Sequence, residues 1–138
     1  MTFTGINYAA AVIAALAGFG LGAIWYMALS KPWLHAMGKT AAELSPETGS
    51  AKAMPFIISI VALLVMAWML AGLMGHLGDV TVRGGVIIGF FCWLGFVITT
   101  MAVNHAFGRA KPMLTLIDGG HWLAVLLVEG AVIGAFGV

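Results

Sequence analysis

Four long apolar segments constrain the fold of this chain more than any other feature of its sequence. The segments, all poor in charged residues, run over about residues 6–29, 54–77, 84–107 and 116–137. Each is close to the roughly 20 residues that a helix needs to cross the hydrocarbon core of a bilayer. Because backbone N–H and C=O groups in lipid must be hydrogen-bonded internally, the segments are predicted to be helices. The expected fold is all-α: an integral membrane four-helix bundle in which residues 1–138 form a single domain.

The scarcity of charge excludes a water-soluble globular protein. Hydrophobic residues make up 62% of the chain and charged residues 8%, whereas about a quarter of the residues in a soluble domain are charged. The lipid bilayer is therefore an expected partner. The net charge is only +1 and the sequence has no basic run. Since nothing supplies the phosphate neutralisation that nucleic-acid binding requires, no nucleic-acid partner is expected.

The basic residues predict an orientation in the membrane. Lys31, Lys39 and Lys52 lie in the polar loop 30–53, and Arg109 and Lys111 lie in the loop 108–115. Arg83 is the one basic residue elsewhere. The positive-inside rule therefore places both of these loops in the cytoplasm and both chain termini outside.

The polar loop between the first two spans is expected to hold a short helical segment in the membrane interface, over residues 31–37. Trp33 would lie there at the level of the lipid headgroups. Trp25 and Tyr26 end the first span with two further rings that suit the same depth. We interpret these three aromatic residues as interfacial anchors.

Local signals also predict where helices begin. Pro55 suits the first turn of the second span, where a missing N–H costs nothing. Thr115 is expected to cap the fourth span, with Asp118 three residues later completing a capping-box-like start. Thr40 and Glu43 form a second pattern of this kind in the polar loop, and the Ser-, Pro- and Gly-containing segment after it reads as a flexible turn over residues 45–50.

Small residues recur four positions apart in the spans. The glycine pairs of this kind are Gly18 and Gly22, Gly85 and Gly89, and Gly130 and Gly134. Such ridges let helix backbones approach closely in a bilayer, where packing supplies the energy of helix association. Two interpretations stay open: packing within the chain, and contact between subunits for one of the ridges.

Glu129 lies well inside the fourth span rather than at one of its ends. A carboxylate at the centre of a bilayer costs about 2.5–3.5 kcal/mol on insertion scales, so its side chain should face protein or water, be paired, or be protonated. One interpretation is a proton-carrying group. The other is a neutral carboxyl that is hydrogen-bonded to the backbone of a neighbouring helix.

Helical periodicity gathers several other residues around Glu129. One stripe of the fourth span, which is expected to face the bundle interior or a partner, comprises Asp118, Trp122, Val125, Glu129, Val132 and Phe136, with His121 beside it. Asp118 and His121 are three residues apart, close enough for a hydrogen bond. Asn104 and His105 end the third span on the same predicted side, so a proton relay is one hypothesis. In the alternative, Asp118 completes a helix cap and both histidines lie at the headgroup boundary.

Patterns for metals and cofactors are missing from the sequence. No helical pair of histidines has the four-residue ligand spacing, and no His-Glu-x-x-His, Walker-type or dinucleotide-binding pattern occurs. Cys92 is the one cysteine, which excludes an internal disulfide and a thiolate cluster. We expect no metal and no cofactor, and a non-enzymatic role is favoured over a membrane enzyme acting on a quinone or a lipid headgroup.

Five short motifs together suggest a family. They are GAIWY at 22–26, KPW at 31–33, MGKT at 37–40, NHAF at 104–107 and LIDGG at 116–120. In this arrangement the chain resembles, over nearly its whole length, a bacterial family of small four-span membrane proteins that is catalogued only as a domain of unknown function. The resemblance implies a multi-pass protein of the bacterial inner membrane, and it supplies no activity, substrate or catalytic residue.

Two functions are compatible with these observations. A bundle this small encloses little room for a substrate path, so the leading hypothesis is a non-enzymatic membrane protein acting as a homo-oligomer or as an accessory subunit of a larger membrane complex. Its glycine ridges and aromatic ends would form the contacts. The alternative is a small proton-coupled transporter or channel in which Glu129 carries the proton, and Asp118, His121 and His105 line the cytoplasmic mouth.

Overall fold

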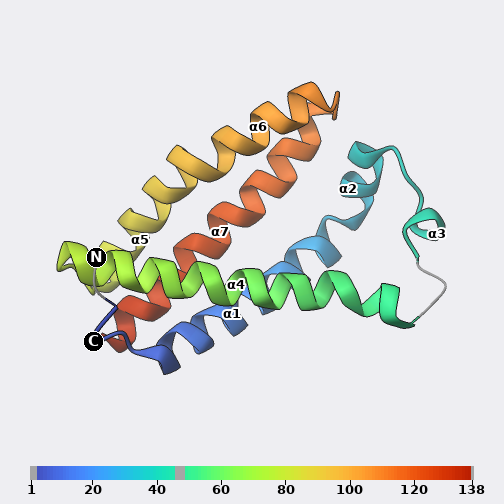
Figure 1. Ribbon diagram of the computed structural model, residues 1–138. Coiled ribbons are helices and arrows are strands. Elements are labelled where there is room, and N and C mark those ends of the chain that lie inside the picture. Colours follow the sequence, from blue (N-terminus) through green and yellow to red (C-terminus); the bar gives the residue numbers. More distant parts are fainter. Residues whose placement is uncertain (1–2, 46–48, 138) are drawn as a thin grey trace.

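A computed structural model describes residues 3–45 and 49–137, and this part of the chain is almost wholly helical, with no strand (Figure 1). Four helical segments in it are long and apolar enough to cross a membrane. They are α1 (Tyr8–Ala28), α4 (Gly49–Leu77), the continuous run of α5 (Val82–Cys92), η1 (Trp93–Val97) and α6 (Ile98–Phe107), and α7 (Pro112–Phe136). The all-α, four-span expectation is confirmed, and the protein is a multi-pass membrane protein.

The helix α7 lies at the centre of the bundle and packs against α1, α4 and α5. Both termini lie at one end, which we call the terminal end, and the connections from α1 to α4 and from α6 to α7 lie at the other, the loop end (Figure 1). Between α1 and α4 the chain forms α2 (Ser30–Met37) and α3 (Ala41–Leu44). The expected helix after the first span is therefore present, and the predicted capping box of Thr40 and Glu43 is confirmed.

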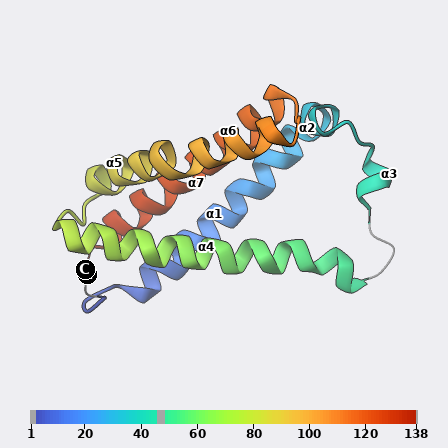
Figure 2. The same ribbon diagram turned by 45° about the horizontal axis from the view of Figure 1, so that its top comes forward.

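The helix α4 diverges from the rest of the bundle toward the loop end (Figures 1 and 2). Its buried residues begin at Leu63, and every residue from 49 through 58 is exposed. At the terminal end, by contrast, Leu70, Ala71 and Met74 of α4 pack into the core. The bundle is thus closed at the terminal end and open between α1 and α4 at the loop end.

Glycines form the closest contact in the bundle, between α5 and α7. A Cβ atom on Gly85 would overlap the backbone of Gly130, and a Cβ on Gly130 would overlap the backbone of Gly85. One turn further along α5, a Cβ on Gly89 would lie 2.6 Å from the carbonyl oxygen of Leu126. A Cβ on Gly134 would overlap the backbone at Thr81. These two ridges therefore serve packing within the chain.

The third span is irregular where it passes the middle of α7. The π-helical turn η1 interrupts the α-helix, and the indole Nε1 of Trp93 donates a hydrogen bond to the carbonyl oxygen of Gly119 at 2.8 Å. Wider turns of this kind occur frequently at functional sites. Here the turn positions Trp93 so that its one polar atom bonds to α7.

Two helix starts differ from the prediction. The helix α4 begins at Gly49, so Pro55 lies inside it rather than in its first turn. The helix α7 begins at Pro112, since proline at this position has a preset helical φ angle and lacks only an N–H that would be unpaired. Thr115 is therefore inside α7 and caps nothing. Of the turn expected at 45–50, residues 46–48 lie outside the described part.

Candidate functional site

Two ionisable side chains of α7 are buried where it packs against α1. In the described part of the chain, the buried polar residues are Glu129, which is 0% exposed, and His121, which is 7% exposed. They are about two helical turns apart. Neither oxygen of Glu129 has a hydrogen-bond partner within residues 3–45 and 49–137, and the Nδ1 atom of His121 has none either. Buried polar atoms without partners are rare in folded proteins, so both groups call for an explanation.

The carboxyl group of Glu129 lies where α1, α4 and α7 meet. A Cβ atom on Gly18 of α1 would lie 3.4 Å from Oε1 of Glu129 and 3.1 Å from Cδ2 of Leu63 on α4. The third atom close to this Cβ position belongs to Val125, which is also apolar. A lone carboxylate is strongly unfavourable among such groups. Glu129 must therefore carry a proton or meet a cation that comes from outside this cluster.

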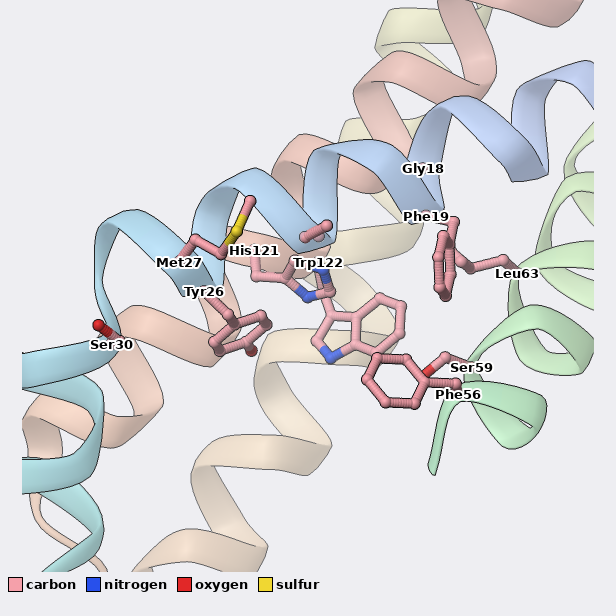
Figure 3. A pocket seen from close by; sticks show the side chains of 12 residues that line it. Gly18, Phe19, Tyr26, Met27, Ser30, Phe56, Ser59, Leu63, His121 and Trp122 are labelled. Carbon is pink, nitrogen blue, oxygen red and sulfur yellow. The ribbon is translucent and has the colours of Figure 1, made fainter. Parts of the chain in front are cut away.

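The imidazole of His121 occupies the space left by Gly22. The Nε2 atom lies 2.9 Å from the position that a Cβ atom of Gly22 would take. The ring stands between two aromatic neighbours, with centroid separations of 4.9 Å from Tyr26 and 4.6 Å from Trp122 (Figure 3). The two glycines of α1 thus face the two buried ionisable groups of α7, and this first ridge also serves contacts within the chain.

The end of α1 is tied to the beginning of α7 by two hydrogen bonds. The hydroxyl of Tyr26 donates to Oδ1 of Asp118 at 2.7 Å, and the indole Nε1 of Trp25 donates to the carbonyl oxygen of Ile117 at 3.1 Å. Asp118 therefore bonds to Tyr26 instead of His121, and the expected Asp118–His121 hydrogen bond is absent from the described residues. Trp25 and Tyr26 direct their polar atoms to α7, while the ring of Tyr26 also contacts Trp33 at a centroid distance of 5.3 Å.

A cavity of about 770 Å³ lies between α1, α4 and α7 on the loop side of Glu129 (Figure 3). Its walls are mainly apolar and include four aromatic side chains: Phe19, Tyr26, Phe56 and Trp122. Ser30, Ser59 and His121 add polar groups. Gly18 and Leu63 belong to its wall, and Gly18 also lies close to the carboxyl of Glu129, which does not itself line the cavity. Its size and its few polar groups are typical of small-molecule sites, which measure about 300–1,000 Å³.

The remaining candidates lie apart from this cavity. The Nδ1 atom of His105 and the hydroxyl oxygen of Thr115 are hydrogen-bonded at 2.8 Å, between α6 and α7. Asn104 is exposed on α6. Neither His105 nor Asn104 lines the cavity, and among the described residues no hydrogen bond joins either of them to Asp118 or His121. The described residues contain no group of three or more His, Cys, Asp or Glu side chains placed to hold a metal ion.

The predicted stripe of α7 faces inward over only part of its length. Val125 and Glu129 are fully buried, as expected from their spacing. Phe136 is 53% exposed, because it ends α7 where neighbouring helices no longer cover it. The cavity itself was not predicted, since Phe19, Phe56 and Trp122 come from three different spans. Ser59, a polar residue in an otherwise apolar part of α4, is the one local signal that pointed to it.

Comparison with known proteins identifies a family and no relative of known activity. The model of a family described as "Protein of unknown function (DUF1761)" matches residues 9–134. No curated protein and no solved structure matches the chain. The match covers all four spans and includes the two buried groups of α7.

Proposed function

We propose that this chain, which belongs to the DUF1761 family, is a small proton-coupled transporter. The family's description assigns no activity. In this proposal Glu129 carries the proton, and the cavity between α1, α4 and α7 binds the transported molecule. The function therefore rests on the site and on no relative.

The observation that carries the proposal is the state of Glu129. Its carboxyl group is fully buried in the middle of a span, and both of its oxygens lack a hydrogen-bond partner in the described part of the chain. A residue kept for structure would gain stability from a partner, because an unsatisfied buried polar group costs about 1–3 kcal/mol. A residue that exchanges a proton must be able to exist without one permanent partner. Intramembrane carboxyl groups typically mark such pathways.

The cavity supplies the second requirement of coupling, which is a ligand whose binding depends on the proton. Gly18 lines the cavity and lies close to Oε1 of Glu129, and it has no side chain to obstruct the approach. A ligand there would experience a neutral or a charged Glu129, so its affinity would differ between the two protonation states. Such a difference in affinity is what couples two binding events.

Reconstitution into liposomes with an entrapped pH-sensitive dye tests this function. With an applied ligand gradient, we expect the wild-type protein to move protons and the Glu129→Gln variant to show no flux above empty liposomes. Glu43→Gln is the matched control, because Glu43 lies exposed in α3 and contributes to a capping box. Equal flux from wild type and Glu129→Gln would rule out proton transfer at this residue.

The positions of the basic residues support an orientation for this transporter. Lys31 and Lys39 lie between α1 and α4, Lys52 lies in the first turn of α4, and Arg109 and Lys111 lie in the second loop at the same end of the bundle. The loop end would then face the cytoplasm of a bacterial inner membrane, with both termini outside. The cavity, with Ser30 and Tyr26 in its wall, would lie on the cytoplasmic side.

Cysteine labelling tests this orientation. In a Cys92→Ser background, a Lys39→Cys variant should resist a membrane-impermeant maleimide in intact cells and react fully after permeabilisation. Thr4→Cys, near the amino terminus, should react in both. The reverse pattern would place the loop end outside.

Assembly with other subunits is a second candidate, and one observation favours it. In an apolar stretch of 18 residues in the third span, only 6% of the stretch is buried against the rest of the chain. A second copy, or a subunit of a larger membrane complex, would cover α5 and α6 there. The glycine ridges are occupied within the chain, so the interface would use the α5–α6 surface. Mass measurement of the native protein in mild detergent separates a homo-oligomer from an accessory subunit.

A further inference from the structure

We infer that the cavity between α1, α4 and α7 accepts a lipophilic organic cation, whose charge is balanced by the carboxylate of Glu129 after its proton is released. This inference rests on the proposed function and specifies its substrate class. One positive charge arrives with the ligand and one leaves as the proton, so the charge buried beside Glu129 stays constant.

The charges around the cavity favour a cation. Among the described residues, no lysine or arginine lines its wall. Asp118 lies just outside, bonded through its Oδ1 to the hydroxyl of Tyr26, and Glu129 lies behind Gly18. An anionic ligand would find no lysine or arginine in the wall and would approach the carboxyl groups of Asp118 and Glu129. A cation would supply the partner that the oxygens of Glu129 lack.

The walls of the cavity favour a cation that carries apolar groups. The four aromatic side chains in the wall come from α1, α4 and α7, and the rings of Phe19 and Phe56 meet edge to face at 6.3 Å between centroids. Figure 3 shows the indole of Trp122 and the ring of Phe56 on the same side of the cavity. Aromatic faces attract cations, and the attraction grows when water is excluded. The same rings bury the apolar parts of the ligand.

The opening of the cavity suits a ligand that is dissolved in the membrane. Residues 49–58 of α4 are exposed because α4 diverges from α1 toward the loop end. The space between these helices is therefore continuous with the surface that faces lipid. Gly18 and Leu63 line the cavity, and Gly18 lies close to Oε1 of Glu129, so we expect the ligand to reach the carboxyl when the side chain of Leu63 rotates away from Gly18.

Few other groups can exchange the proton. Between Lys52 and His76, α4 has no ionisable residue. The neighbouring helices carry four ionisable residues: Tyr8 and Tyr26 on α1, and Arg83 and Cys92 on α5. On α7 itself, the other ionisable residues are Asp118 and His121. None of these is hydrogen-bonded to Glu129 in the described part of the chain. His121 lines the cavity and its Nδ1 atom has no partner in the described part of the chain, so we assign to it the relay of the proton toward the opening.

A pair of ions of nearly equal size and opposite charge tests the inference. Tetraphenylphosphonium and tetraphenylborate are titrated into the full chain in nanodiscs, with empty nanodiscs subtracted. We expect the cation to bind at least about tenfold more tightly than the anion, a ratio that corresponds to about 1.4 kcal/mol. In weakly buffered solution, cation binding should release close to one proton per bound ion.

Three variants locate the binding. Glu129→Gln should weaken cation binding about tenfold and abolish proton release, whereas Glu43→Gln should leave both unchanged. Phe56→Ala should weaken binding severalfold through the loss of one aromatic face. Phe56 is 57% exposed, so this replacement tests the cavity even if changes at Glu129 disturb folding. Full retention of affinity in both Glu129→Gln and Phe56→Ala would overturn the assignment.

The outcomes separate this inference from the proposed function. Equal affinity for the two ions, or no binding of the cation, overturns the substrate class, while Glu129-dependent proton flux with another ligand would keep the transporter. Selective cation binding without flux in liposomes would keep the cation site and overturn transport.

Discussion

Replacing Gly130 by valine is expected to prevent α5 and α7 from packing, and to lower the free energy of unfolding by about 4 kcal/mol or more. Any Cβ atom at this position would overlap the backbone of Gly85, and backbone atoms have no alternative rotamer to adopt. Because α7 is the helix against which the other spans pack, the damage should spread through the bundle. We expect little monodisperse protein after detergent extraction and size-exclusion chromatography.

Gly20→Val is the matched control for this experiment. Gly20 is also a glycine inside a span, but a Cβ atom there would meet nothing within 4 Å. The change therefore introduces the same β-branched side chain into a helix without a clash, and the elution profile and thermal midpoint should stay close to wild type. If Gly130→Val and Gly20→Val behaved alike, the close α5–α7 contact would be wrong.

Replacing Glu129 by methionine is expected to stabilise the protein while it abolishes the proposed proton transfer. Methionine is flexible and similar in length to glutamate, and its apolar side chain suits the surroundings formed by Gly18, Leu63 and Val125. Removing a buried polar group that lacks partners should raise the free energy of unfolding by about 1–3 kcal/mol. The thermal midpoint in detergent, followed by tryptophan fluorescence, measures this gain.

The comparison with glutamine makes the experiment decisive. Glu129→Gln keeps a buried polar group of the same shape, so it should abolish proton flux without the gain in stability. A structural carboxyl, hydrogen-bonded to a neighbouring helix, predicts the opposite order, because methionine would then leave the former partner unsatisfied. A lower midpoint for Glu129→Met than for wild type would therefore favour the structural role.

Much of the fold was predictable because membrane insertion depends on local composition. Each span can be recognised from its own run of about 20 apolar residues, without knowledge of the helices that pack against it. The helix starts were less predictable, because more than one local signal competed at each of them. The helix α7 begins at Pro112 and not at the capping pattern of Thr115. The hydroxyl of Thr115 is instead hydrogen-bonded to His105.

The sequence identified the two buried ionisable residues of the site, Glu129 and His121, but not the cavity beside them. Glu129 stood out because a carboxylate in the middle of a span is costly, and its helical spacing with Val125 correctly placed both inside the bundle. The hydrogen bond expected between Asp118 and His121 is absent from the described residues, although Tyr26 contacts both side chains. Tyr26, which comes from another span, bonds to Asp118 instead, and sequence spacing along α7 contains no information on that approach.

The sequence by itself determined that the chain crosses the membrane four times as helices and that α7 buries an ionisable group. Hydropathy and helical periodicity decide both, and these are properties of contiguous residues. Only the tertiary structure decided that Gly18 and Gly22 face Glu129 and His121, and that Phe19, Phe56 and Trp122 enclose a cavity. Those relations depend on how helices cross, and crossing is set by close backbone contacts such as that of Gly85 with Gly130, which join residues far apart in the chain.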